Sequence, residues 1–154
     1  MPSKYERTYT KIEKLFQRPL AELEVGDHFK LKSGGFMDLS VEVLPDCEET
    51  GGKLVSMCHY FEQNGDLCQD PEMVVRLFPP GSTAFLELTP STDAKRGRAE
   101  SMVFQQAIPP VYDVVYPEPG KYRPKVRESL NTFMLFWLGN LLEQGHAPEP
   151  PEET

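Results

Sequence analysis

The most regular pattern in the chain is an apolar stripe near the C-terminal end. Its members recur at positions i, i+3, i+4, i+7 and i+8, the spacing of one face of an α-helix: Leu130, Phe133, Met134, Trp137, Leu138, Leu141 and Leu142. Ser129 or Asn131 can begin this helix, and Gly145 follows where helices commonly end in glycine. The pattern predicts a buried amphipathic helix over 129–144.

Two further apolar residues of this segment, Leu135 and Phe136, lie outside the stripe. Apolar side chains therefore cover more of the helix circumference than one buried face requires. A helix of this kind is packed on two sides or contacts a partner. We expect Leu135 and Phe136 to meet the sheet, a protein partner or a second copy of the chain.

A second helix is predicted at the N-terminus. Its apolar stripe has helical spacing and consists of Tyr5, Tyr9, Ile12 and Phe16. Ser3 and Glu6 form a capping-box pair at its start, and Pro19 should end it. The basic residues make a separate stripe: Lys4, Arg7, Lys11, Lys14 and Arg18. We interpret this stripe as a solvated face or, alternatively, as a contact for an acidic partner.

Between the two helices the pattern changes to the alternation typical of β-strands. Strand candidates are residues 29–32, 36–44, 53–61, 73–78, 83–88, 102–104 and 111–116. Asn64-Gly65 is typical of a tight hairpin turn. Because Pro71 cannot donate a ladder hydrogen bond, we expect 66–71 to be a loop or a frayed edge. Residues 90–100 are polar, and we expect them to form a mobile loop.

This order of elements predicts an α+β fold. Strands clustered between terminal helices indicate a single antiparallel meander sheet of five to seven strands, with the N-terminal helix and the C-terminal amphipathic helix packed on it. The length of 154 residues fits one domain. We assign the domain to residues 1–145. Residues 146–154 are expected to be a disordered tail rich in Pro and Glu.

The charge of the chain is acidic and uneven. The formal net charge is −8 at pH 7, which disfavours binding to nucleic acid, because phosphate contacts need clustered cations. Residues 1–20 carry five basic and two acidic side chains, whereas residues 22–72 carry twelve acidic and three basic ones. An acidic flank beside local basic clusters suits a protein partner at least as well as DNA.

The sequence also bears on the compartment. No apolar run approaches the length of a membrane span, and the first residues lack the apolar core of a secretory signal. Cys47, Cys58 and Cys68 have no metal-site spacing, and three cysteines cannot all pair within one chain. We therefore expect free thiols and a cytoplasmic protein without membrane contacts.

The densest polar segment surrounds the predicted hairpin turn. It contains the candidate site residues His59, Glu62, Asn64, Asp66 and Asp70. His59 with Asp66 or Asp70 could form a metal or acid–base site, whereas His59 and Glu62 point to opposite faces of a strand. The alternative is an ordinary hairpin with a solvated acidic tip.

No other motif indicates catalysis. The chain lacks a nucleophile elbow and a phosphate-binding P-loop, and its three histidines include His146 in the expected tail. We therefore assign no catalytic, cofactor-binding or metal-binding residue and expect no cofactor. An enzyme is disfavoured but stays open.

A short basic segment precedes the C-terminal helix. Lys121, Tyr122 and Arg123 interleave cations with an aromatic ring, as in surfaces that stack on nucleic-acid bases. The acidity of the whole chain disfavours that interpretation. We expect these three residues, together with Leu135 and Phe136, to contact a protein partner.

Two stretches resemble known families of unknown function. Residues 59–66 (HYFEQNGD) and 70–73 (DPEM), followed by the strand 112–116 (YDVVY), resemble the signature of an uncharacterised domain in small proteins of bacterial mobile elements and phages. The helix pattern from Leu130 to Gly145 is similar to that domain and to the end of the YqiB-like family. The resemblance covers residues 36–145 and implies the same α+β fold but no activity.

Two functional hypotheses follow. The first is a non-catalytic, protein-binding accessory domain, with a role in a bacterial mobile element or in counter-defence. It would use the last helix or the acidic 22–72 surface, with a protein partner or a homodimer as the assembly. The second is a small-ligand-binding protein or enzyme centred on His59, Asp66 and Asp70.

Overall fold

The computed structural model describes residues 3–45, 53–63, 66–82, 96–107, 110–118, 121 and 123–148, with only the backbone of residues 61–63 and 66–70. Among these residues, no helix is long and apolar enough to span a membrane. The elements in chain order are α1 (Lys4–Phe16), the 3-10 turn η1 (Leu20–Glu22), β1 (His28–Lys32), β2 (Leu39–Leu44), β3 (Lys53–Gln63), β4 (Asp66–Phe78), β5 (Arg98–Gln106), β6 (Val111–Val114), α2 (Pro124–Glu143) and β7 (Ala147–Pro148).

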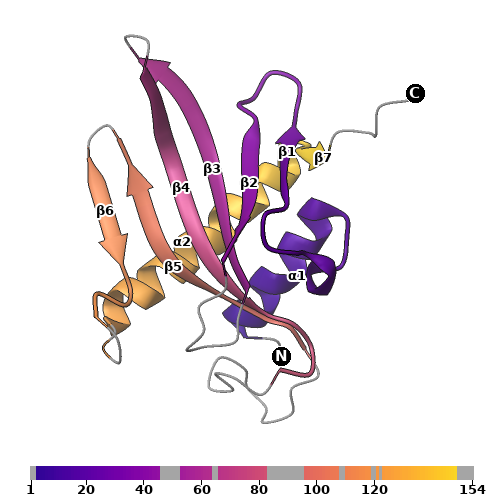
Figure 1. Ribbon diagram of the computed structural model, residues 1–154, viewed down its shortest axis with the longest axis vertical. Coiled ribbons are helices and arrows are strands. Elements are labelled where there is room, and N and C mark those ends of the chain that lie inside the picture. Colours follow the sequence, from indigo (N-terminus) through magenta and orange to yellow (C-terminus); the bar gives the residue numbers. More distant parts are fainter. Residues whose placement is uncertain are drawn as a thin grey trace.

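The described strands form one antiparallel sheet in the order β6-β5-β4-β3-β2-β1-β7. Strands β1 to β6 make a meander in which each strand pairs with the next along the chain. Both helices lie on one face of this sheet (Figure 1). The predicted α+β architecture is therefore confirmed, with seven strands.

The core lies between the helices and this face of the sheet. Alternate residues of the strands point into it, because successive side chains of a strand face opposite sides. Val41, Met57 and Met73, which are paired across β2, β3 and β4, are almost completely buried. Helix α1 contributes Ile12 and Phe16, and the other face of the sheet carries the alternate residues.

Helix α1 begins and ends as the sequence predicts. The Ser3 side chain accepts a hydrogen bond from the backbone of Glu6, and the Glu6 carboxylate accepts one from the backbone of Ser3. Gln17 closes the helix in the left-handed region, with φ 57°. The proline at position 19 then prevents the chain from continuing as a helix.

Helix α2 starts earlier than the apolar stripe predicts. It begins at Pro124 rather than at Ser129, because proline suits the first turn, where no intrahelical N–H bond is lost. Asn131 therefore lies inside the helix and not at its cap. Gly145 follows the helix with φ +83°, as expected of a terminating glycine.

The loop predicted at 66–71 was wrong, and the loop predicted at 90–100 extends three residues too far. Strand β4 runs through Pro71, because the register shifts there: Tyr60 pairs with Gln69 and Cys58 with Glu72. This bulge lets two residues of β4 oppose one of β3, so Pro71 is not needed as a donor. Strand β5 begins at Arg98 and not at 102, within the expected loop 90–100. The strand predicted at 83–88 lies outside the described residues.

The end of the domain folds back onto the sheet. Ala147 and Pro148 pair with Lys32 and Leu31 of β1, which makes β7 an edge strand. His146, expected in the tail, is only 4% exposed. Residues 149–154 of that expected tail lie outside the described part of the chain.

Candidate functional site

The backbone separates the residues of the predicted hairpin site. Asp66 pairs with Gln63, four residues along β3 from His59, and this spacing corresponds to about 13 Å along a strand. Asp70 lies opposite His59 at the bulge. Asn64 and the side chains of Glu62, Asp66 and Asp70 lie outside the described structure. The described geometry therefore does not bring His59 and Asp66 together.

His59 points to the helix-covered face of the sheet and is 9% exposed. Its Nδ1 donates to the carbonyl oxygen of Asp38 at 2.9 Å. Its ring packs edge-on against Trp137 of α2, with 5.6 Å between centroids and an angle of 81° between the planes. These contacts give His59 a packing role between the sheet and α2.

A second buried histidine, His146, completes this cluster. Its ring centroid lies 5.9 Å from that of His59. Nε2 lies 2.8 Å from the carbonyl oxygen of Met37, and Nδ1 lies 3.2 Å from that of Leu141. His146 therefore ties the end of α2 to the β1–β2 hairpin. From the sequence we expect His146 in the tail. A residue just after a capping glycine, however, commonly packs back on its helix.

Charged side chains are buried at the other end of the sheet. The buried ion-pair cluster consists of Arg76, Glu100, Tyr116 and Arg127. Glu100 is completely buried, and its carboxylate accepts hydrogen bonds from Arg76 and, at 2.6 Å, from the Tyr116 hydroxyl. It also forms an ion pair with Arg127, whose Nε lies 2.9 Å away. Burial, followed by the hydrogen bond to Glu100, raises the pKa of Tyr116.

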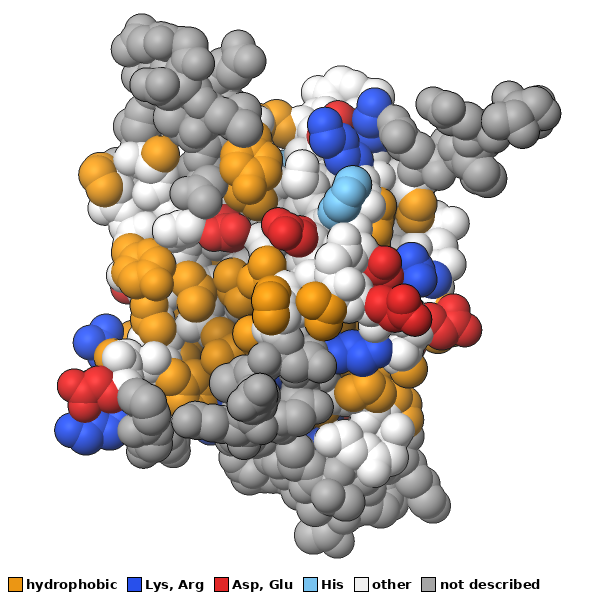
Figure 2. All heavy atoms as spheres, viewed as in Figure 1, with side chains coloured by type: hydrophobic (Ala, Val, Ile, Leu, Met, Phe, Trp, Pro, Cys, Tyr) orange, Lys and Arg blue, Asp and Glu red, His pale blue; other side chains and the backbone are white. Residues whose placement is uncertain are grey.

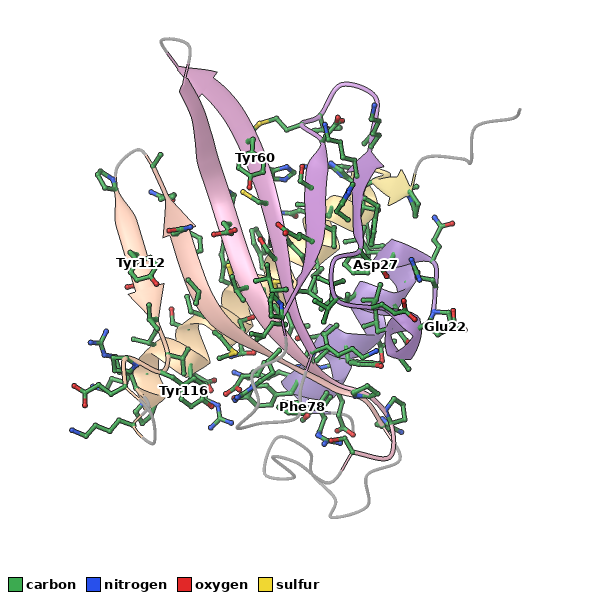
Figure 3. The ribbon with its side chains drawn as sticks, viewed as in Figure 1. Glu22, Asp27, Tyr60, Phe78, Tyr112 and Tyr116 are labelled. Carbon is green, nitrogen blue, oxygen red and sulfur yellow. The ribbon has the colours of Figure 1, made fainter. Side chains whose placement is uncertain are left out.

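This cluster joins four segments of the chain. Arg76 lies on β4, Glu100 on β5, Tyr116 after β6 and Arg127 in the first turns of α2. The guanidinium of Arg76 also lies 5.0 Å from the centre of the Tyr116 ring and 5.3 Å from that of Phe78. Figure 3 shows Tyr116 and Phe78 at this end of the sheet. Each member has a structural partner, so the cluster is best explained as a polar core.

The sheet face opposite the helices, called the open face below, carries a different set of residues. In the described ranges no helix covers it, and Figure 2 shows hydrophobic side chains gathered over its central part. One row of cross-strand neighbours runs from β6 to β1 through Val114, Val103, Val74, Ser56, Glu42 and His28. The three valines are half-buried, whereas Glu42 and His28 are exposed.

The neighbouring row places a carboxylate in the middle of this face. Glu72 accepts a hydrogen bond from Ser56 Oγ at 2.7 Å and another from the Gln105 side-chain amide. Donors from β3 and β5 thus orient the carboxylate between them. Because these strands flank β4, the position of Glu72 is set by the sheet itself.

Two exposed tyrosines lie on the open face. Tyr112 of β6 is 66% exposed and Tyr60 of β3 is 39% exposed (Figure 3). Burial and the neighbouring Cys58 raise the pKa of Tyr60 to about 12, and Glu72 and Glu42 act in the same direction. The Tyr60 hydroxyl therefore stays a neutral hydrogen-bond donor in the physiological pH range.

A small hollow lies beside Tyr60 on this face. Its volume is about 160 Å³, and its lining includes His28, Ser40, Glu42 and Ser56. Cys58 is a buried thiol, whereas Cys47 and the Cys68 side chain lie outside the described residues. Within the described part of the chain, no group of three or more His, Cys, Asp or Glu side chains could hold a metal ion.

The partner contacts predicted near α2 lie in different environments. Phe136 is 67% exposed on the outer side of the helix, and Leu135 is half-buried. Lys121 is exposed and pairs with Glu118 at 3.3 Å, and Arg123 is the exposed N-cap residue of α2. Tyr122 lies outside the described residues.

Comparison with known proteins gives a family but no activity. No curated protein and no solved structure matches the chain. A family model described as a domain of unknown function, DUF6908, matches residues 7–147. This range begins in α1 and ends in β7, so it includes nearly all of both helices and the sheet. The chain therefore belongs to the DUF6908 family of domains of unknown function.

Proposed function

We propose that this protein is a non-catalytic accessory domain that binds another protein through the open face of its sheet. The observation that carries the proposal is the row of three neighbouring valines on that face: Val74, Val103 and Val114. Contiguous apolar side chains next to polar ones are typical of protein-binding surfaces. Tyr60 and Tyr112 support the proposal, because tyrosine is enriched in such interfaces.

The charges of the open face favour a particular kind of partner. Glu42 is exposed, and Glu72 is oriented by Ser56 and Gln105 at the border of the valine row. Both belong to the segment 22–72, whose twelve acidic side chains outnumber three basic ones. The partner that fits presents apolar side chains flanked by lysine or arginine, since complementary charge gives orientation and specificity.

The cellular role is a further part of the proposal. The sequence signature at 59–73 and 112–116 resembles a domain of bacterial mobile elements and phages. This resemblance supports an accessory or counter-defence role in the bacterial cytoplasm. The acidic surface supports it as well, because an acidic protein can compete with nucleic acid for a basic partner.

The alternative of an enzyme or small-ligand binder centred on His59, Asp66 and Asp70 has less support. His59 is buried against Trp137 and donates to a backbone carbonyl, as a packed core histidine does. Asp66 pairs with Gln63, which lies four residues along β3 from His59. No described contact of these residues favours catalysis over packing.

The proposal is tested by affinity capture from the source cell, with matched surface variants as bait. We expect Val103→Glu and Glu42→Lys to lose a partner that the wild-type chain captures, and Lys14→Glu, exposed on α1, to retain it. Calorimetry with the purified partner should then show at least about a tenfold weaker affinity for each open-face variant, equal to about 1.4 kcal/mol. A partner that is lost only with Lys14→Glu would overturn the proposal and assign binding to the basic stripe of α1.

A further inference from the structure

The sheet has two edges, and they differ in how they are covered. Beyond β1 the edge is closed by β7, whose two residues include Pro148. A proline at an edge keeps further strands from pairing with it. The other edge is formed by β6, which pairs with β5 on one side only. Figure 1 shows β6 as the outermost strand, with no described helix or strand beyond it.

The hydrogen bonds of β6 show which of its backbone groups point outward. Val115, directly after the strand, donates its N–H to the carbonyl oxygen of Met102 at 2.9 Å, in the register that joins β5 and β6. Along an antiparallel ladder, successive residues alternate between bonding to the partner strand and pointing away from it. Tyr112 and Val114 therefore turn their N–H and C=O groups away from β5. Within the described ranges, these outward groups make no hydrogen bond.

The side chains of β6 lie on both faces of the sheet. Tyr112 and Val114 are on the open face, in the rows that contain Gln105 and Val103 of β5 (Figure 3). Asp113 is on the other face, is exposed and makes no ion pair with the residues that the structure describes. A strand added to β6 would place one side chain beside Asp113 and the two neighbouring side chains on the open face.

We propose that the outer edge of β6 is where an extended segment of the protein partner adds to the sheet as a further strand. This inference rests on the proposed function and specifies how the partner attaches. The segment exchanges hydrogen bonds with the outward N–H and C=O groups of Tyr112 and Val114. It carries lysine or arginine opposite Asp113, and the residues on either side are apolar because they lie beside Val114 and the Tyr112 ring.

A second copy of the chain fits this edge poorly. Two β6 strands related by a two-fold axis use all the outward groups only if Tyr112 of one copy pairs with Val114 of the other. Asp113 then lies directly opposite Asp113 of the second copy, and like charges at that position destabilise a strand pair. A shift in one direction would require Pro110, which has no N–H, and a shift in the other would require Tyr116, which lies beyond the end of β6. The edge therefore favours a different chain with a basic residue.

The probe for this edge is a capped peptide with the core valine-lysine-valine between two threonines. Its length matches the strand, because Pro110 and Pro117 bound the segment with which it can pair. Short strands bind weakly, so the isotope-labelled full chain is titrated with the peptide up to about 5 mM and followed by NMR. We expect the amide signals of Tyr112 and Val114 to shift most, and both amides to exchange more slowly with solvent. Absence of shifts in β6 at the highest concentration overturns the inference, as do shifts confined to other elements.

The preference for a basic residue is tested with a second peptide in which glutamate replaces lysine. We expect the wild-type chain to bind it at least about threefold more weakly than the lysine peptide, and Asp113→Lys to reverse the order. Asp113 is exposed, so this variant should keep the wild-type fold. Equal binding of the two peptides by the wild type would overturn the choice of a basic partner.

The role of the backbone is tested by comparing Tyr112→Pro with Tyr112→Ala. Both variants remove the ring, but only proline also removes the outward N–H, and an edge strand tolerates proline where its N–H faces solvent. We expect Tyr112→Pro to keep the wild-type circular-dichroism spectrum and to bind the lysine peptide at least about tenfold more weakly than Tyr112→Ala. Equal affinities of the two variants would overturn strand addition at β6.

The same two variants separate this inference from the proposed function. A captured partner that is lost with Val103→Glu should also be lost with Tyr112→Pro and be held better by Tyr112→Ala. If Tyr112→Pro and Tyr112→Ala hold that partner equally, the open face remains the binding surface and strand addition alone is overturned. If the lysine peptide binds β6 while Val103→Glu and Glu42→Lys lose no partner, the open-face proposal is overturned and the edge remains.

Discussion

The ring of Tyr9 lies so close to Gly97 that a β-carbon at position 97 would come 2.3 Å from Tyr9 Cε1 and 2.5 Å from Cδ1 and Cζ. Tyr9 is on α1, and Gly97 directly precedes β5. The helix therefore approaches this strand at a point where the chain has no side chain. Both residues are buried, and the contact fixes the distance between α1 and the sheet.

The first prediction concerns Gly97. Gly97→Ala forces the Tyr9 ring or α1 to move, and we expect a loss of about 3 kcal/mol in the free energy of unfolding, as for other overpacked cores. Urea denaturation measures it. Gly139→Ala is the control, because a β-carbon there meets only the Lys11 ammonium, at 3.7 Å; alanine inside a helix should stabilise by about 0.5–1 kcal/mol. Equal effects of the two variants would contradict the role of the Tyr9 contact.

The second prediction concerns the Tyr9 hydroxyl. Among the described residues it is buried without a hydrogen-bond partner, and burial, helped by Glu13, raises its pKa above the ordinary value. The folded state therefore holds this proton more tightly than the unfolded chain. This difference in pKa contributes to the free energy of unfolding. The contribution is complete below about pH 10, the pKa of tyrosine in the unfolded chain, and it falls as the pH rises further.

Tyr9→Phe removes this titration. Near pH 7 we expect the unfolding free energy to change by less than about 1 kcal/mol, since the hydroxyl lost is an unsatisfied one. Above pH 10 the variant should lose less stability than the wild type. Denaturation curves between pH 7 and 11 measure the difference, and parallel pH profiles for the two proteins would refute it.

Sequence patterns located the helices and the meander because both depend on local spacing. The stripe from Leu130 to Leu142 and the Ser3–Glu6 capping box are short-range features, and the structure confirms both. The strand through Pro71 was missed because its bulge depends on the pairing of β3 with β4, which local propensity does not encode.

The candidate site was harder to predict for the same reason. His59 stands in a polar segment of the sequence, yet its ring contacts Trp137 and His146, which are about eighty residues away along the chain. The valine row of the open face joins β4, β5 and β6, and the alternation within each strand does not give the register that aligns Val74, Val103 and Val114.

The third prediction concerns the buried ion-pair cluster. Glu100→Gln leaves Arg76, itself 2% exposed, and Arg127 without the carboxylate that faces both. Removing one partner of a buried ion pair typically costs about 3–5 kcal/mol, so we expect a loss in that range. Glu118→Gln breaks the exposed pair with Lys121 and should change the unfolding free energy by less than about 1 kcal/mol. Thermal and urea unfolding compare the two, and a Glu100→Gln protein as stable as Glu118→Gln would refute the prediction.

The fourth prediction concerns Asn131, the completely buried polar residue of α2. Its Oδ1 accepts from the backbone N–H of Ser101 at 2.9 Å, and its Nδ2 donates to the carbonyl oxygen of Arg127 at 2.7 Å. Ser101 lies where the register of β4 and β5 shifts, so the strand alone does not satisfy this N–H. Asparagine thus links the helix to an irregular point of the sheet.

Asn131→Leu fills a similar volume but leaves the Ser101 N–H buried without its acceptor. We expect a loss of about 2 kcal/mol or more, because an unsatisfied buried donor keeps its full desolvation penalty. Thr132→Leu, one residue further on the exposed side of α2, should change stability by less than about 0.5 kcal/mol. Hydrogen exchange gives a second measurement: the Ser101 amide should exchange faster in Asn131→Leu while amides in β2 and β3 keep their protection. Unchanged protection at Ser101 would show that another group accepts this hydrogen bond.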